Sequence, residues 1–75
     1  MKNVMISLPS VEAVKNFNSK IFGLLGDFDL GTGRYIVDAR SIMGIFSLDL
    51  SKPLTLTIHS DQPDEIVEAL KDFIV

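Results

Sequence analysis

Alternating hydrophobic and polar residues, together with short apolar-rich runs, predict four strands in this chain. The alternation is clearest in LTLTIHS, residues 54–60, which places leucine and isoleucine on one face and threonine and histidine on the other. DFDLGTGRYIVDA, residues 27–39, predicts a β-hairpin with one wet face and a turn at the GTG of residues 31–33. The remaining strand is VMISL, residues 4–8, which ends before Pro9.

Helical spacing predicts three helices between these strands. VEAVKNFNSKIF, residues 11–22, follows Ser10 as a good N-cap and places Val11, Val14, Phe17 and Ile21 on one face. A short helix is predicted from residue 41 to about residue 48. The last helix covers DQPDEIVEALKDFIV, residues 61–75, with Asp61 as its N-cap and a buried stripe of Ile66, Ala69, Leu70 and Phe73.

The predicted order βαββαβα favours an α+β fold in two layers. Each helix has one apolar face, so the helices cover one side of an antiparallel sheet, and the polar side of the sheet meets water. A chain of 75 residues allows one domain only, over residues 1–75.

Composition removes several classes of function. The chain has no cysteine, which excludes disulfides, thiolate metal sites and cysteine nucleophiles. The net charge is -3 and the seven basic residues are scattered, which disfavours nucleic-acid binding. No apolar run approaches the ~20 residues that span a bilayer, and no signal peptide is present, so we expect a cytoplasmic protein without membrane contact. The aspartates at 27, 29 and 38 lack a tight loop of oxygen ligands, so neither a metal nor a cofactor is expected.

The segment ARSIMGIFSLDL, residues 39–50, is unusually apolar and carries the most specific motif. SIMG followed by SL closely resembles the regulatory-serine segment of HPr, the phosphocarrier protein of the bacterial sugar phosphotransferase system. LTLTIHS and the acidic DEIVEAL are similar to the closing pattern of the same family. The resemblance implies an open-faced sandwich. In it, a four-stranded antiparallel sheet of order 1-4-2-3 is covered on one face by two longer helices and one short helix.

The first half of the chain departs from the family at the residue that carries the chemistry. In HPr proteins a histidine at the start of the first helix takes the phosphoryl group, followed by an arginine and a proline. The family's spacing, counted back from Ser41, places Ser10 at the histidine, Glu12 at the arginine and Ala13 at the proline. The only histidine, His59, is expected on the order of 20 Å from Ser10, at the other end of the first strand. We therefore expect no phosphate relay and no enzymatic activity.

The resemblance implies a regulatory phosphorylation site at Ser41, although the residues alone predict only an N-cap for the short helix. It also implies a partner-docking surface, with Arg40, Ile42, Met43 and Phe46 as candidates. Phe46 could instead pack inward over the loop at Pro53, and we expect a mixed outcome with Met43 exposed. The implied partners are proteins: a serine kinase/phosphorylase, a transcriptional regulator or enzymes of the phosphotransferase system.

Three hypotheses follow from these patterns. The first is an HPr-like regulatory or binding module that lacks the phosphorelay. The second is a small ligand-binding βαββαβ domain of ferredoxin-like type, whose strand order would be 4-1-3-2 and whose second helix would be longer. The third is an atypical phosphocarrier, which the serine and glutamate near residue 10 disfavour.

Overall fold

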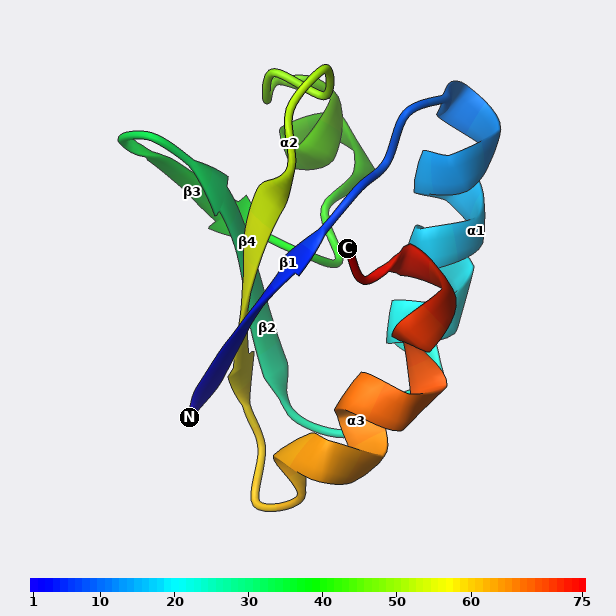
Figure 1. Cartoon of the computed structure of the whole chain (residues 1–75), viewed down its shortest axis with the longest axis vertical. Coiled ribbons are helices and arrows are strands. Elements are labelled where there is room, and N and C mark those ends of the chain that lie inside the picture. Colours follow the sequence, from blue (N-terminus) through cyan, green and yellow to red (C-terminus); the bar gives the residue numbers. More distant parts are fainter.

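Strands and helices alternate along the chain in the order βαββαβα, as the sequence predicts, in a computed structural model that describes all 75 residues (Figure 1). A short 3₁₀ turn follows the last helix. The elements are β1 (Lys2–Ile6), α1 (Val11–Phe22), β2 (Asp27–Thr32), β3 (Tyr35–Asp38), α2 (Ile42–Phe46), β4 (Leu54–His59), α3 (Pro63–Ala69) and η1 (Lys71–Phe73).

The four strands form one antiparallel sheet in the order β1-β4-β2-β3. Figure 1 shows α1 and α3 on one side of this sheet, while the other side is left open. The order 1-4-2-3 confirms the two-layer open-faced sandwich and contradicts the ferredoxin-like alternative, which required 4-1-3-2. None of the helices is long and apolar enough to cross a bilayer.

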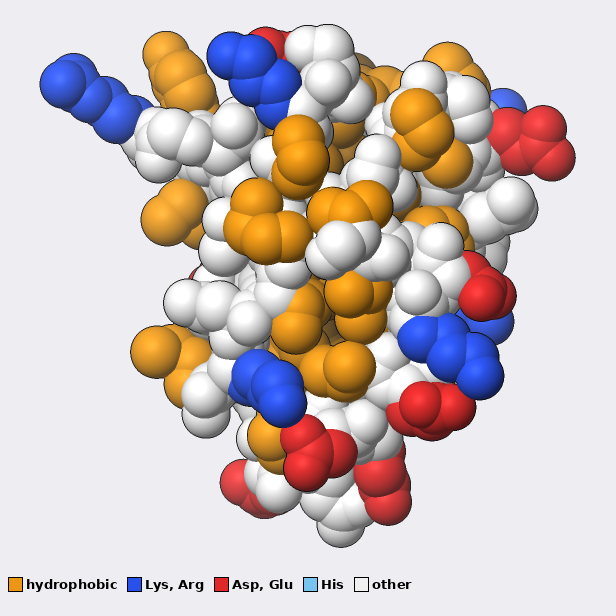
Figure 2. Space-filling model, in the orientation of Figure 1, with side chains coloured by type: hydrophobic (Ala, Val, Ile, Leu, Met, Phe, Trp, Pro, Cys, Tyr) orange, Lys and Arg blue, Asp and Glu red, His pale blue; other side chains and the backbone are white.

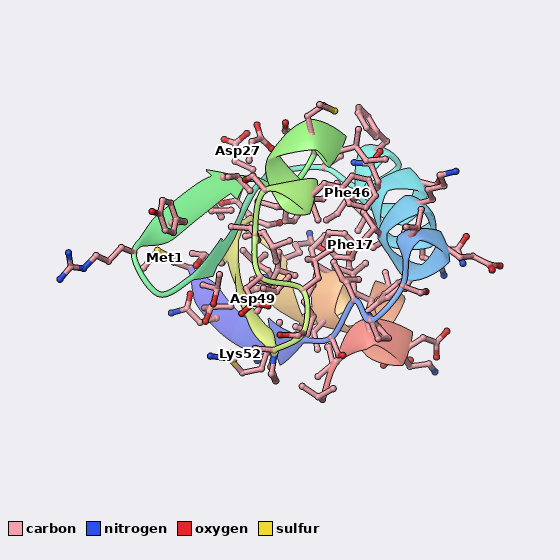
Figure 3. The ribbon with its side chains drawn as sticks, turned by 90° about the horizontal axis from the view of Figure 1, so that it is seen from above. Met1, Phe17, Asp27, Phe46, Asp49 and Lys52 are labelled. Carbon is pink, nitrogen blue, oxygen red and sulfur yellow. The ribbon has the colours of Figure 1, made fainter.

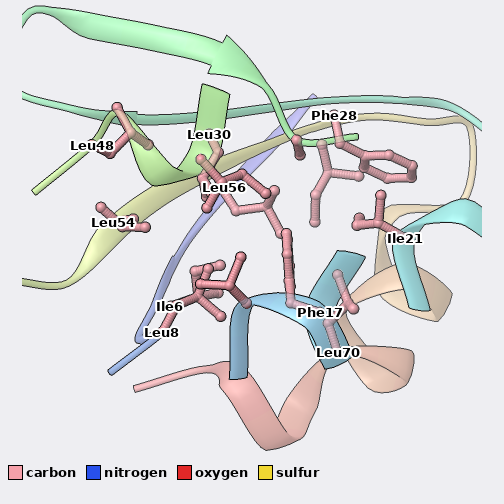
Figure 4. Packing of buried hydrophobic residues seen from close by; sticks show 14 of the residues in the cluster. Ile6, Leu8, Phe17, Ile21, Phe28, Leu30, Leu48, Leu54, Leu56 and Leu70 are labelled. Carbon is pink, nitrogen blue, oxygen red and sulfur yellow. The ribbon is translucent and has the colours of Figure 1, made fainter. Parts of the chain in front are cut away.

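The core lies between the helices and the inner face of the sheet (Figure 4). Every polar residue is at least partly exposed, so the core is wholly apolar. On the face shown in Figure 2 the charged side chains lie mostly around the margin, and hydrophobic side chains run along the middle. The rings of Phe17 and Phe73 meet edge to face with their centroids 5.5 Å apart, an arrangement that aromatic pairs favour. The predicted stripe of α1 is confirmed at Val14, Phe17 and Ile21, whereas Val11 is 57% exposed at the helix start.

The C-terminal segment differs from the predicted single helix over residues 61–75. Pro63 stands at the start of α3, so Gln62 and not Asp61 occupies the N-cap position. The helix ends at Ala69, and the chain then returns to the edge of β1. There Ile74 bridges to Ile6, and the N–H of Val75 donates to the carbonyl of Met5 at 3.0 Å. Backbone bonds to this strand edge replace the last helical turns.

The β2–β3 turn lies slightly later than predicted. Thr32 still pairs with Tyr35, so the turn consists of Gly33 and Arg34. Gly33 has a φ of 57°, which favours glycine. Gly31 lies inside β2, where a Cβ atom would approach the Tyr35 carbonyl oxygen to 2.8 Å, so the close approach of β3 requires glycine there.

Candidate functional site

Ser10 is the N-cap of α1. Its backbone is extended, with φ -144° and ψ 163°, and its Oγ accepts a hydrogen bond from the Ala13 N–H at 3.1 Å. Pro9 precedes it, and Glu12 lies in the first helical turn, exposed to solvent. The hydroxyl therefore has a structural partner, and the nearest ionisable group in the first turn carries negative charge.

His59 lies at the opposite end of the fold from Ser10. It is the last residue of β4 and pairs with Asp27 at the start of β2, after the loop that follows α1. Its Nε2 is 3.0 Å from Asp29 Oδ2. The twelve residues of α1 alone span ~18 Å between the two ends, and Figure 1 shows the start of α1 and the end of β4 at opposite ends of the molecule. The structure does not bring these two residues together.

Ser41 is the N-cap of α2. Its Oγ accepts a hydrogen bond from the Gly44 N–H at 3.1 Å, and the residue is exposed. A Cβ atom at Gly44 would lie 3.1 Å from both Ser41 Oγ and Val37 Cβ. Glycine at this position therefore lets α2 pack closely against β3 while the cap is formed.

The apolar residues of α2 and the turn after it divide between the core and solvent. Ile45 and Leu48 are buried, whereas Met43 is 79% and Phe46 is 40% exposed. Ile42 is partly buried against the core. Phe46 lies on the side of α2 toward α1 (Figure 3). This division agrees with the mixed outcome expected from the sequence. Below, the α2 surface means Ile42, Met43 and Phe46.

Arg40 connects the start of α2 to the end of α1. Its Nη2 donates to the Leu24 carbonyl oxygen at 2.8 Å, and its guanidinium carbon lies 5.0 Å from the centroid of the Phe28 ring. Its carbonyl oxygen accepts from Asn18 Nδ2 at 3.1 Å. The guanidinium is thus bonded to a backbone carbonyl, and Ser41 Oγ has the Gly44 N–H as its partner. A docking role for Arg40 stays a prediction.

Phe22, the last residue of α1, is 63% exposed and was not predicted as a candidate for the site. Phe22 follows Asn18 by four residues, so the two share one helix face. Because Asn18 bonds to Arg40, this face of α1 is turned toward the start of α2. In the sequence, Phe22 lies outside the apolar stripe of its helix, and this position could have indicated an exposed aromatic side chain.

One hollow in the molecule is lined by neither Ser10 nor Ser41. It has a volume of about 730 Å³ and lies between the α1–β2 and β4–α3 loops, where Asp61 and Glu65 contribute carboxylates. These carboxylates disfavour a phosphate there. Nowhere in the chain do three histidine, aspartate or glutamate side chains come together in a way that could hold a metal ion.

The sheet order and the serine-capped α2 define the class of small phosphocarrier proteins with an open-faced sandwich fold. The family described as "PTS HPr component phosphorylation site" matches residues 9–75, and the chain belongs to this HPr family of the sugar phosphotransferase system. Its members are phosphocarriers and not enzymes, and they interact with other proteins of that system.

Two solved structures are similar over nearly the whole chain. HPr-C-His from Thermoanaerobacter tengcongensis has a TM-score of 0.81 and 26% identity, covering 96% of this chain and 89% of its own. A phosphocarrier protein HPr from Bacillus anthracis str. Ames has a TM-score of 0.75 and 26% identity, covering 99% of this chain and 94% of its own. No curated protein matches the sequence.

Proposed function

We propose that this HPr-family chain is a regulatory binding module that docks protein partners through the α2 surface and does not relay phosphate. One observation carries the proposal. At the start of α1, where the family's histidine is expected, the side chain is the capping hydroxyl of Ser10, with Glu12 in the same turn. The remaining histidine is at the other end of the sheet, bonded to Asp29.

The chemistry of phosphoryl transfer explains why Ser10 beside Glu12 should not relay phosphate. A phosphohistidine passes its phosphoryl group on readily because an imidazole that titrates near neutral pH is a good leaving group. A phosphate ester on Ser10 would be a poor donor. The carboxylate of Glu12 would also repel an incoming phosphoryl group, which an arginine would attract.

His59 is a poor replacement, which argues against the atypical phosphocarrier. Its Nε2 is bonded to the Asp29 carboxylate, and Asp27 is its direct neighbour across the sheet. A phosphoryl group approaching this imidazole would meet the carboxylates of Asp29 and Asp27, so we expect no transfer to it.

The surroundings of Ser41 support a regulatory role for this residue. Its hydroxyl is exposed, and a phosphate there would add close to two negative charges while its oxygens could still accept from the Gly44 N–H. The Arg40 guanidinium donates from Nη2 to the Leu24 carbonyl, which holds this positive charge beside the end of α1. The added charge would lie beside the exposed side chains of Met43 and Phe46, where a docked partner would meet it.

The partners of this surface are proteins of the cytoplasm. A serine kinase/phosphorylase would modify Ser41, and a transcriptional regulator or phosphotransferase-system enzymes would dock on the α2 surface. An exposed methionine beside a half-exposed phenylalanine suits docking to apolar pockets, because methionine adapts its shape.

A gain-of-function variant tests the relay half of the proposal. Wild type, Glu12→Arg and the double variant Ser10→His with Glu12→Arg are incubated with phosphoenolpyruvate and the first enzyme of the system. Acid-labile phosphoprotein is then measured. Only the double variant should be labelled, since it alone carries an imidazole at the start of α1. Labelled wild type would contradict the proposal.

Phosphorylation by the family's bifunctional kinase and ATP tests the regulatory half. Wild type and Ser47→Ala should each gain one phosphate, whereas Ser41→Ala should gain none. Ser47 is the matched control because its hydroxyl is also exposed and also bonds within α2, to the Gly44 carbonyl. An unmodified wild type would leave a binding domain without this regulation.

A further inference from the structure

The two edge strands of the sheet, β1 and β3, differ in whether another segment pairs with their outer side. The outer side of β1 is partly paired by the C-terminal segment, through the Ile6–Ile74 bridge. No segment pairs with the outer side of β3. Tyr35 and Ile36 of this strand are 73% and 71% exposed. Figure 1 shows β3 at the margin of the sheet, with the β2–β3 turn projecting from the molecule. Exposed apolar edges of this kind are normally avoided because they pair with other strands.

The hydrogen-bonding pattern shows which backbone groups of β3 point outward. Ala39 N–H donates to the Phe28 carbonyl at 2.9 Å, which turns the odd-numbered residues of this segment toward β2. Backbone groups alternate in direction along an antiparallel strand, so Tyr35 and Val37 bond inward. Ile36 therefore presents its N–H and carbonyl outward. Asp38 does the same, although its carbonyl already accepts from the Ser41 N–H at 2.9 Å.

We propose that β3 pairs antiparallel with β3 of a second copy of this chain, with Ile36 opposite Ile36 on the two-fold axis. In this register the two outward-facing Ile36 residues exchange both backbone hydrogen bonds. Each Arg34 then lies opposite Asp38 of the second copy, which gives two opposite-charge pairs. Centring the pair on Val37 instead would set Ile36 against Asp38 and lose both charge pairs.

The side chains on both faces of the strand fit the same register. On the open face the sequence runs positive, apolar, negative at Arg34, Ile36 and Asp38, and this pattern is complementary to its own reverse. On the other face Tyr35 would lie beside Val37 of the second copy. Asp38 uses Oδ1 to accept from the Arg40 N–H at 2.8 Å, which leaves its other oxygen for Arg34.

The pairing would be weak and would change how the docking surface is presented. A four-residue edge buries much less than the ~1,600 Å² of a standard stable interface, so the dimer should form only at high concentration. A two-fold axis perpendicular to the sheet keeps the helices of both copies on the same side. Two α2 surfaces would then face a dimeric partner together, and binding at both would raise the apparent affinity.

Sedimentation and NMR over a concentration series test the pairing directly. We expect concentration-dependent dimerisation, with the largest amide shifts at Ile36 and Asp38. In a mixture of labelled and unlabelled chains, an isotope-filtered experiment should show Tyr35 Hα close to Val37 Hα of the other copy. These protons are two residues apart along one strand, so their contact must be intermolecular. A chain that stays monomeric at millimolar concentration would overturn the proposal.

Charge-swapped variants separate this edge from every other surface. Arg34→Glu gives an acidic edge and Asp38→Lys a basic one, so each alone should be monomeric while their mixture dimerises. Circular dichroism first establishes that Asp38→Lys, which loses the bond to the Arg40 N–H, is folded. Ile36→Lys, which keeps that bond, should also be monomeric. Leu25→Lys should dimerise like wild type, since Leu25 is 89% exposed in the α1–β2 loop. Dimerisation that survives Ile36→Lys would show that a different surface is used.

Discussion

The starts of α1 and α2 share the same capping hydrogen bond and differ in the residues around it. Ser10 and Ser41 each accept one hydrogen bond at 3.1 Å from the N–H three residues later. The first turn of α1 carries the acidic Glu12, and α1 continues for twelve residues with its apolar stripe in the core. The five-residue α2 has no acidic residue in its first turn and exposes Met43 and Phe46. A capping serine is therefore not a functional site by itself, and the neighbouring side chains decide whether a partner can use it.

The largest difference between the two helix starts should be in partner affinity, when an exposed apolar residue near each serine is replaced by aspartate. Met43→Asp should weaken partner binding by about 2 kcal/mol or more, as expected at the centre of an interface. Val11→Asp, at a site that is 57% exposed beside Ser10, should leave binding unchanged. Calorimetric titration with a partner protein measures both. Equal losses would show that docking includes the start of α1.

Removal of either cap should cost similar stability. Ser10→Ala and Ser41→Ala should each lower the free energy of unfolding by about 1 kcal/mol, because each leaves a helix-terminal N–H without its partner. The corresponding loss in Tm is about 4–8 °C per kcal/mol for a domain of this size. Urea denaturation gives the values. A Ser41→Ala variant as stable as wild type would mean that its cap contributes nothing and that the hydroxyl has another purpose.

Replacement of each serine by aspartate keeps an oxygen acceptor at the cap and adds charge, so the effects should be smaller. Ser41→Asp should be more stable than Ser10→Asp by roughly 0.3–1 kcal/mol, because α2 has no acidic residue in its first turn whereas α1 has Glu12. Only Ser41→Asp should change partner binding. The reverse order of stability in urea denaturation would contradict the electrostatic difference between the two helix starts.

Substitutions in the loop after α2 should have the smallest effect, a change in the pKa of Asp49. Hydrogen bonds from the Ser51 hydroxyl and N–H, in that order of importance, lower the pKa of Asp49 below its ordinary value, with a further contribution from Lys52. A lowered pKa means that the carboxylate stabilises the folded state above the unfolded pKa and loses this contribution as pH falls through the folded pKa. Ser51→Ala should raise the pKa of Asp49 in an NMR titration, and Lys52→Ala should raise it less. An unchanged value in Ser51→Ala would contradict this cause.

Periodicity predicted most of the fold because most of the buried side chains lie on helices and strands, and the longer of these have a regular apolar face. Leu54, Leu56 and Ile58 of β4 and Val14, Phe17 and Ile21 of α1 are all buried as their spacing indicates. Strand ends were less predictable: β1 covers Lys2–Ile6, yet Leu8 is buried beyond its end. The return of Ile74 to β1 depends on backbone bonds between distant segments, which a local pattern does not reveal.

The sequence predicted which residues belong to the candidate site, but not the contacts that they make with other elements. The resemblance between residues 39 and 50 pointed to Ser41, and the apolar excess of that segment indicated exposure of Met43. The position of the Arg40 guanidinium depends on the end of α1, which packs beside α2 only in the folded chain. Phe22 lies on the side of α1 toward α2 because of this same packing. Contacts between elements therefore had to come from the structure.

Phosphosite mapping of the wild-type chain after parallel incubation with both phosphate donors tests the absence of relay most directly. One sample receives phosphoenolpyruvate and the first enzyme, the other ATP and the family's serine kinase, and intact masses are read at alkaline pH, where phosphohistidine survives. We predict no added phosphate in the first sample and one phosphate on Ser41 in the second. Phosphate on Ser10 or His59 in the first sample would contradict the absence of relay.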